Sequence, residues 1–496
     1  MRLKSTASFA QRFVNVNLRQ FVARCTALMR LPALLFACAA QHAYATDGYF
    51  DTSWVGGGRI AFEGDVNDPS DSYATGIALD SGGNLLLLGT ASTATSAYPW
   101  LGQLQANGQF VPSFGAADGT GRINGCSYYS VQLCNYDYAN AVAIQPDGRY
   151  VVATSHHVFR TTAKALALDT LEGNAFVVND AAGSVTATSA LAIQSATKVL
   201  AAGAGRYSSV VDKSLFGVVR LGSDLALDPS FGAMKDAQQT TFAGGALVDI
   251  SAGDAGEVVQ SIFVRPDGRI VLEGLGYPAD GSTNYVEAAR FSADGLLDTA
   301  YGNNGVAKVA WSYGSIYDVG AAVMDSAGRI VVATTGITSA FGVRGMLVTR
   351  LDASGSLDTS FGDAFAGPGF SFNSNAQCPY LYGNGAAVDS AGRILVVGSC
   401  MTSSGTTYFA IERLRGDGTL DTSFGASGFS LGAYVTGNTV NVGYSIALDA
   451  SGRPIVAGGT GVSALDHAGV ARITYDLIFT DAFEAAPRGC SPPDCN

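Results

Sequence analysis

The sequence predicts an all-β fold, a seven-bladed β-propeller of four-stranded antiparallel blades. Two recurring phrases predict it. The first reads L-D-T-S-F-G at residues 357–362 and 420–425, with close variants at 227–232 and 297–302 and weaker copies at 51–54 and 111–115. The second is a turn between two apolar runs, usually led by Asp and closed by Gly-Arg, which is typical of a β-hairpin. A phrase that returns about every 60 residues indicates a repeat architecture.

The hairpins divide the chain into seven units. Six hairpins carry glycine and the third carries threonine: Gly83, Gly148, Thr197, Gly268, Gly328, Gly392 and Gly452. The third is identified because residues 190–203 align without gaps with residues 141–154. A third apolar strand, the first phrase and a short fourth strand follow each complete hairpin. Four short strands separated by turn residues are the pattern of a propeller blade.

The strand before each hairpin reads as the innermost strand of its blade. Counted back from the hairpin residue, the fourth and sixth positions are mostly large and the fifth and seventh mostly small, as in Leu79, Ile77, Ala78 and Gly76. Both faces are apolar, so both must be covered. The face with small side chains is typical of strands that converge on the propeller axis, where little space is left between blades.

The two ends of the repeats are complementary. The repeats begin with a phrase copy at 51–54 and a fourth-type strand at 58–62, and they end with a third-type strand at 470–473. The last unit therefore lacks the strand that the N-terminus has to spare. We expect these two strands to pair and close the ring, which removes two exposed edges.

The first 45 residues differ from the rest. They hold six basic and no acidic residues, an apolar run at 31–40 and the tripeptide Ala43-Tyr44-Ala45. This pattern predicts a secretory signal peptide over 1–45, with an apolar run too short to span a bilayer. An alternative is a lipid anchor at Cys38, because residues 35–38 loosely resemble a lipobox. We expect a secreted or periplasmic protein with a propeller at 46–475 and a tail at 476–496.

Charge limits the partners. Removal of the first 45 residues takes the net charge from −12 to −18, and no cluster of Lys or Arg occurs after Arg30. Nucleic acid and anionic lipid both require basic patches. We therefore expect no nucleic-acid partner. The shortness of the apolar run at 31–40 predicts no transmembrane segment, and we take the protein to be a monomer.

Six cysteines remain after the predicted signal peptide, and an even number in an exported chain suggests disulfides. Cys378 and Cys400 flank one hairpin almost symmetrically, and Cys126 lies eight residues from Cys134. None has the spacing of a metal site. The expected pairs are Cys126–Cys134, Cys378–Cys400 and Cys490–Cys495.

The search for catalytic chemistry gives little. His156 and His157 are adjacent, and neighbours on a strand point to opposite faces, so they cannot easily share one metal ion. The acidic residues are scattered at turns, where Asp bonds backbone N–H groups. G-x-S-x-G, H-E-x-x-H and the phosphate-binding loop do not occur in a supporting context. The sequence predicts no catalytic residue, no metal and no cofactor.

The loop at 125–140 is the best candidate for a binding surface. It carries Tyr128, Tyr129, Tyr136 and Tyr138 together with Asn and Ser. Tyrosines next to Asn and Ser favour recognition of proteins or sugars. The alternative is that these rings pack against the mouth of the ring.

The pairing of L-D-x-S-F-G with D-G-R-I-V-V-A-G resembles the delta-60 repeat of exported bacterial proteins. The resemblance covers residues 50–475 and is strongest near Gly268, Gly328, Gly392 and Gly452. It implies a propeller-like array and no particular activity. The favoured hypothesis is an exported, non-catalytic binding or scaffold module for an unknown protein or carbohydrate.

The alternative hypothesis is a propeller hydrolase or lyase that acts on an extracellular substrate. Propellers host many functions, so the fold cannot choose between the two. An enzyme would need titratable groups that converge in one pocket.

Overall fold

The computed structural model describes residues 48–64, 71–93, 95–115, 120–124, 136–165, 167–173, 175–179, 183–206, 213–232, 239–242, 244–250 and 254–475. The described residues all belong to one of the two units into which the chain divides, Asp47–Asn496, called here the second unit. The predicted signal peptide and the tail at 476–496 lie outside them. Over the described ranges, no helix is long and apolar enough to cross a membrane.

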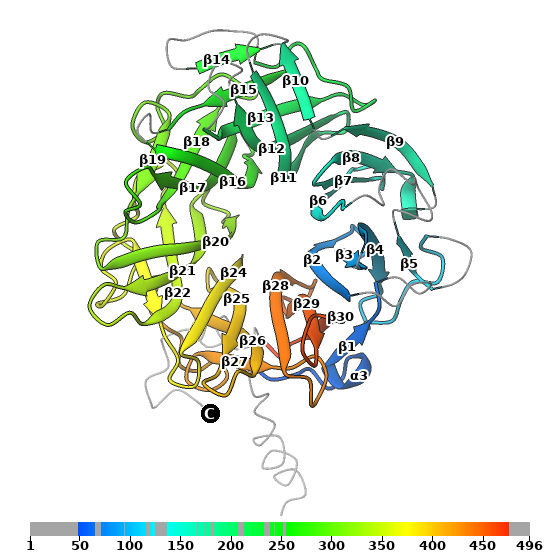
Figure 1. Ribbon diagram of the computed structural model, residues 1–496, viewed down its shortest axis with the longest axis vertical. Helices are drawn as coiled ribbons and strands as arrows, with labels where there is room; N and C mark the ends of the chain where they lie inside the picture. Colours follow the sequence, from blue (N-terminus) through cyan, green and yellow to red (C-terminus); the bar gives the residue numbers. More distant parts are fainter. Residues whose placement is uncertain are drawn as a thin grey trace, which may run out of the picture. The chain divides into compact units, whose positions relative to one another are not determined.

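The second unit is the predicted seven-bladed propeller of antiparallel sheets (Figure 1). Blades 1 to 3 contain β2 (Asp71–Leu79), β3 (Leu85–Ser92), β4 (Ala97–Leu104) and β5 (Arg122–Asn124); β6 (Ala139–Ile144), β7 (Tyr150–Thr154), β8 (His157–Thr161) and β9 (Leu168–Gly173); and β10 (Ala175–Asn179), β11 (Gly183–Ser195), β12 (Lys198–Arg206), β13 (Leu215–Leu221), β14 (Gln239–Phe242) and β15 (Gly245–Val248).

Blades 4 to 7 repeat the four-strand pattern. They contain β16 (Asp254–Val264), β17 (Ile270–Pro278), β18 (Tyr285–Phe291) and β19 (Val306–Val309); β20 (Gly314–Met324), β21 (Ile330–Thr338), β22 (Arg344–Leu351) and β23 (Phe370–Asn373); β24 (Tyr380–Val388), β25 (Ile394–Met401), β26 (Thr407–Leu414) and β27 (Phe429–Gly432); and β28 (Val440–Leu448), β29 (Pro454–Gly461), β30 (His467–Arg472) and β1 (Arg59–Phe62). A short α3 (Val55–Gly58) and a 3-10 turn, η3 (Ala163–Ala165), complete the described elements.

The third blade differs from the prediction by two added strands. Its order is β10-β11-β12-β13-β15-β14, so β10 and β14 extend a four-stranded sheet at its two edges. The degenerate hairpin forms as predicted, because β11 ends at Ser195 and β12 begins at Lys198, with Thr197 in the turn.

The innermost strands are the ones that precede the hairpins, namely β2, β6, β11, β16, β20, β24 and β28 (Figure 1). Seven apolar clusters fill the structure, one between each pair of neighbouring blades. The core is therefore distributed around the ring, and each blade is covered on both faces as its sequence requires.

The hairpin aspartates act as turn caps, as the sequence predicts. Asp325 Oδ1 accepts hydrogen bonds from the backbone N–H groups of Ala327 and Arg329 at 2.9 and 3.0 Å. Gly328 adopts a φ of +76°, which side chains other than glycine resist. The same arrangement recurs at Asp389 and Asp449.

The first phrase forms a corner that holds two blades together. Asp421 Oδ1 accepts from the backbone N–H and the hydroxyl of Ser423 at 3.2 and 2.7 Å. Phe424 is fully buried in the cluster between blades 6 and 7. Sequence reasoning missed a further partner. Arg413, on the third strand, donates from Nε to Asp421 Oδ2 at 2.8 Å and lies 4.8 Å above the Phe424 ring.

This pairing of a third-strand arginine with an aspartate, which we call the Arg–Asp latch, occurs in six of the seven blades. The aspartate belongs to the phrase in five of these blades and to β9 in blade 2. Its nitrogen–oxygen distances are 2.6–3.0 Å, and the pairs are Arg160–Asp169, Arg220–Asp228, Arg290–Asp298, Arg350–Asp358, Arg413–Asp421 and Arg472–Asp51. In five of these blades the guanidinium also donates to a backbone carbonyl of the next blade: Ser223, Ala293, Ala353, Gly416 or Ala106. The latch therefore links consecutive blades by charge-assisted hydrogen bonds.

The ring closes as predicted. Strand β1 pairs antiparallel with β30, with Arg59 opposite Ala471. Asp51 supplies the latch carboxylate to Arg472, whose guanidinium lies 5.5 Å from the Trp54 ring. In blade 7, the N-terminal copy of the phrase therefore supplies the latch aspartate and the aromatic ring that the internal copies supply in other blades.

Every innermost strand shifts its register eight residues before the hairpin residue. The positions are Thr75, Asn140, Ser189, Gln260, Gly320, Asn384 and Tyr444. Four of these side chains donate to the backbone of the next blade, at the carbonyls of Ala139, Thr188, Val259 and Gly443. Polar groups closest to the axis therefore serve contacts between blades.

Candidate functional site

The propeller has two faces with different chemistry. One, the hairpin face, carries the turns between first and second strands and the Arg–Asp latches. The other, the loop face, carries the turns between second and third strands and the beginnings of the innermost strands. Connecting loops on a rigid scaffold are where binding residues concentrate. The exposed tyrosines of the innermost strands lie on the loop face.

Five consecutive blades, 5, 6, 7, 1 and 2, present tyrosines near the beginnings of their innermost strands. Tyr317, Tyr380 and Tyr138 are 51%, 42% and 41% exposed. We call the full set the tyrosine arc, which consists of Tyr317, Tyr380, Tyr382, Tyr444, Tyr73 and Tyr138. Three members, Tyr73, Tyr138 and Tyr382, stand ten residues before their hairpin glycine, so the alignment contained a sign of the arc that sequence reasoning overlooked.

Arg344 joins the arc in blades 5 and 6. It is the first residue of β22, and its guanidinium carbon lies 4.4 Å from the Tyr317 ring centre and 5.6 and 5.8 Å from those of Tyr382 and Tyr380. Its Nη1 donates to the Tyr382 hydroxyl at 3.3 Å. Cation–π attraction therefore holds rings from two blades around one positive charge.

A second part of the arc crosses from blade 7 to blade 1. The ring centres of Tyr444 and Tyr73 are 5.7 Å apart. Burial, with a smaller effect from Tyr73, raises the pKa of Tyr444 to about 12. Burial also raises the pKa of Tyr73. Both phenols therefore keep their protons at physiological pH and can donate hydrogen bonds.

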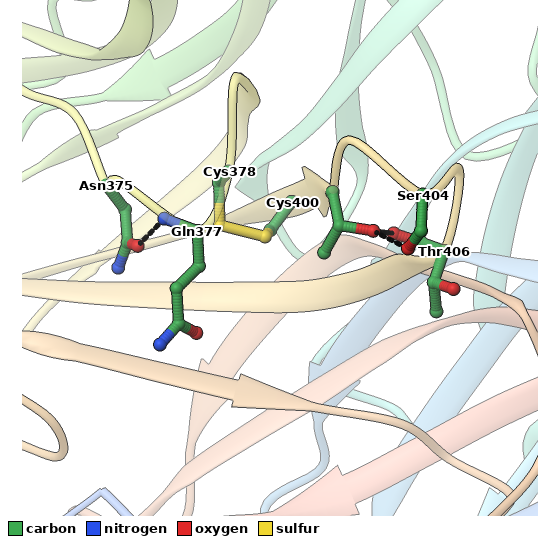
Figure 2. The surroundings of a disulfide bond; sticks show 7 residues. Asn375, Gln377, Cys378, Cys400, Ser404 and Thr406 are labelled. Atoms are coloured by element: carbon green, nitrogen blue, oxygen red, sulfur yellow. Dashed lines mark hydrogen bonds between the residues drawn. A yellow bond between two sulfur atoms is a disulfide. The ribbon is translucent and has the colours of Figure 1, made fainter.

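A disulfide joins Cys378 to Cys400 beside the arc, as expected from their positions around the hairpin (Figure 2). The two Cα atoms are 5.0 Å apart, and Cys400 faces Leu381 across the β24–β25 pair. Figure 2 shows the Gln377 side chain pointing away from the sulfur atoms. The bond fixes the beginning of β24, where Tyr380 lies. Cys126, Cys134, Cys490 and Cys495 lie outside the described residues.

The predicted binding loop is described only in part. Tyr128 and Tyr129 lie outside the described residues. Tyr136 is exposed and has a φ of +54°. Tyr138 belongs to the tyrosine arc. Of the four tyrosines predicted in this loop, the structure therefore describes Tyr136 and Tyr138, and both are exposed.

Asp137 organises the two histidines. It is fully buried, and its Oδ2 lies 2.7 Å from Nδ1 of His157 while its Oδ1 accepts the backbone N–H of His156 at 2.8 Å. The side chain of His156 is 57% exposed and that of His157 is 20% exposed. A buried carboxylate that orients an imidazole provides two of the three members of a triad-type arrangement. In the described part of the chain, no group of three or more His, Cys, Asp or Glu side chains could hold a metal ion.

The strongly perturbed carboxyl groups belong to the blade interiors. Burial alone would raise the pKa of Asp228, but hydrogen bonds from Ser230 and the charge of Arg220 lower it to about 2. Burial raises the pKa of Glu273 to about 8 and raises that of Glu412 well above its usual value. These groups lie in a latch and on strands β17 and β26, so their shifts have structural causes.

Several solved structures resemble this chain at low sequence identity. Semaphorin 1a from Drosophila, extracellular domains 1–2, aligns with a TM-score of 0.40 and 10% identity over 84% of this chain and 88% of that one. The polysaccharide lyase Uly1 gives 0.45 and 10% over 87% and 97%. Aldose sugar dehydrogenase from Streptomyces coelicolor gives 0.37 and 13% over 68% and 93%.

Sequence comparison adds a family match. No curated protein matches the sequence. Residues 328–361 and 392–424 match a family model described as a domain of unknown function, DUF5122, beta-propeller. Each matched range runs from a hairpin to the aromatic residue of the phrase in blade 5 or blade 6. The match and the seven-bladed fold together make this chain a β-propeller repeat protein.

Proposed function

We propose that this protein is an exported, non-catalytic binding module that engages a protein partner through the tyrosine arc. The packing of Arg344 among tyrosines from two blades carries the proposal. Tyrosine and arginine dominate the binding energy of protein interfaces, and tyrosine loses little conformational entropy on binding. The arc stands on innermost strands of a closed ring, so its rings are positioned before a partner arrives.

Export is part of the proposal. The basic and apolar residues of 1–45 support a cleaved signal peptide, and the Cys378–Cys400 disulfide supports an oxidising compartment. The recurring phrases support membership of the delta-60 repeat proteins. In this role the disulfide holds Tyr380 in place for binding.

The test compares arc variants with a matched surface variant. The full chain, Tyr317→Ala with Tyr380→Ala, Arg344→Gln, and the control Tyr49→Ala would be screened in parallel against a panel of exported and surface proteins and a glycan array. Tyr49 is exposed but lies outside the arc. We expect a protein ligand whose affinity falls at least tenfold in the arc variants and is unchanged in Tyr49→Ala.

Two outcomes would change this conclusion. Binding to glycans alone, lost in the same variants, would make the arc a carbohydrate site. A ligand that binds all four forms equally would remove the arc from the function.

A hydrolase is the second candidate, and the contact between Asp137 and His157 favours it. A carboxylate at Nδ1 holds the imidazole so that Nε2 can act as a general base. A panel of ester, glycoside and polysaccharide substrates would test it. Activity that is lost in His157→Gln and reduced in Asp137→Asn, but kept in His156→Gln, would support an enzyme. No turnover by the wild type would exclude this candidate for the substrates tested.

A further inference from the structure

Blade 1 is the one blade without an Arg–Asp latch among the described residues. Gln103 stands in place of the arginine and Val111 in place of the aspartate, with the usual spacing of eight residues. The backbone still follows the pattern, because the N–H of Val111 donates to the carbonyl of Gln103 at 2.9 Å, as Asp228 does to Arg220 at 2.8 Å. A cavity of about 760 Å³ opens here on the hairpin face, between blades 1 and 2.

The acceptors that surround a latch guanidinium persist in this cavity. In blade 3, Arg220 donates to Ser230 Oγ at 3.0 Å and to Gln194 Oε1 at 3.3 Å, besides its bond to Asp228. The corresponding residues of blade 1 are Ser113 and Asp80, and both line the cavity. Asp80 moreover places a carboxylate where blade 3 has a neutral amide.

Tyr150 fills part of the vacated space. Its position carries isoleucine in blades 4, 5 and 6, and its ring lies 5.9 Å from that of Phe114, the aromatic residue of the blade 1 phrase. Gln103 Nε2 donates to Asp80 Oδ2 at 2.9 Å and to the Tyr150 hydroxyl at 3.4 Å. The amide donors of Gln103 are thereby used. Asp80 also accepts hydrogen bonds from the backbone N–H groups of Gly82 and Asn84 and from Asn84 Nδ2, at 2.8–2.9 Å, so it offers a ligand its negative charge. The hydroxyl oxygens of Ser113 and Tyr150 remain as acceptors.

Gln145 supplies an independent indication of a ligand. It lines the cavity from blade 2 and is only 3% exposed. Its Oε1 atom has no hydrogen-bond partner among the described residues. A buried carbonyl oxygen without a donor is unfavourable, so native proteins seldom leave one unpaired. A bound molecule that donates hydrogen bonds would satisfy it.

We propose that this cavity binds a guanidinium group, brought either by a small molecule or by an arginine side chain of a peptide. The planar guanidinium offers five N–H donors in a fixed fork, which matches several oxygen acceptors at once. Asp80 supplies the opposing charge. The other charged residue that lines the cavity, Lys164, is exposed at its rim, where water and salt screen its ammonium group.

Calorimetric titration of the full chain at low ionic strength tests the proposal. The probes are agmatine, L-arginine and the capped tripeptide acetyl-Gly-Arg-Gly-amide, with 1,5-diaminopentane as a cation that lacks the planar fork. We expect saturable one-to-one binding of at least one guanidinium probe and at least tenfold weaker binding of the diamine. The tripeptide and the two free compounds distinguish a peptide ligand from a small molecule.

Two sets of variants locate the binding. Asp80→Asn should weaken it at least tenfold, while Asp325→Asn, the same turn position in a blade with a complete latch, should leave it unchanged. The triple variant Gln103→Arg, Val111→Asp and Tyr150→Ile should rebuild the latch, fill the cavity and abolish binding. A cavity that holds only water, seen as no saturable binding of any probe, would overturn the proposal. Equal affinities of Asp80→Asn and Asp325→Asn would also overturn it, even if the triple variant did not fold.

Discussion

Two carboxyl groups with opposite environments show how single residues set the pH dependence of this protein. Ser230 and Arg220 keep Asp228 ionised, with a pKa of about 2, whereas burial keeps Glu273 neutral, with a pKa of about 8. The stabilising contribution of Asp228 is present above pH 4 and is lost as the pH falls towards 2. The contribution of protonated Glu273 to the free energy of unfolding is complete below about pH 4.5. It is lost as the pH rises towards 8, because in this range the unfolded chain releases the Glu273 proton while the folded chain still holds it.

Glu273→Gln is expected to remove this second dependence. Between pH 5 and 8 the wild type should lose up to about 1.4 kcal/mol of unfolding free energy per pH unit relative to the variant. Urea unfolding at pH 5, 6.5 and 8 measures the difference. Asp280→Asn is the control, because hydrogen bonds from Ser282 lower the pKa of Asp280 and it is ionised throughout this range. Parallel pH profiles of wild type and Glu273→Gln would contradict the assignment.

At the scale of the element, the Arg–Asp latch joins the third strand of a blade to the segment that leads into its fourth strand, and in five blades the arginine also bonds a carbonyl of the next blade. Arg350 and Asp358 are a representative pair, with side chains 3% and 12% exposed and a separation of 2.8 Å. Their removal from water is unfavourable, so the pair depends on good geometry and on further hydrogen bonds. Gly416 of blade 6 accepts one from Arg350. The latch therefore fixes the position of one blade against the next, in addition to stabilising the fold.

Asp358→Ala is expected to destabilise the protein by about 3–5 kcal/mol, because it leaves the buried Arg350 without its counter-ion. The double variant Arg350→Met with Asp358→Leu should recover most of this loss, since it replaces both charges by apolar groups. Chemical denaturation of the two variants and the wild type measures the effect. A single variant as stable as the double variant would show that the charge is solvated in the absence of its partner.

At the scale of the whole molecule, the ring depends on one pairing between the chain's two ends. Strand β1 covers the edge of β30, and Asp51 completes the seventh blade. An uncovered strand edge is a template for pairing with another chain. Stability and solubility of the propeller should therefore both depend on residues 48–62.

Deletion of residues 1–64 is expected to lower the midpoint of thermal unfolding and to produce oligomers in light scattering. A permuted chain that carries residues 47–64 after residue 475, through a short glycine linker, should restore a stable monomer. This joint is feasible because Thr474 donates its backbone N–H to Tyr49 at 2.7 Å. A monomeric deletion variant of unchanged stability would show that the closing strand is dispensable.

The repeats explain what could be predicted. The hairpins, the innermost strands and the ring closure could be predicted because the two phrases recur, so that each copy supports the structural assignment of the other copies. Among the described residues, strands β10 and β14 have no counterpart in another blade, so no second copy in the sequence indicated them. Four of the six latches were visible in the sequence as an arginine and an aspartate eight residues apart, but only the fold shows that they meet. The tyrosine arc was harder to foresee, because its residues come from five different blades.

The closing strand also constrains the order in which the molecule can be completed. A chain made from its N-terminus produces β1 first and β30 last, and Tyr49 and Thr474, which bond in the folded state, are 425 residues apart. Blades 1 to 6 are each built from consecutive strands and can form as they emerge, whereas blade 7 must wait for the final repeat. Throughout biosynthesis the nascent propeller therefore has two open strand edges, which stay uncovered until the last strand is made.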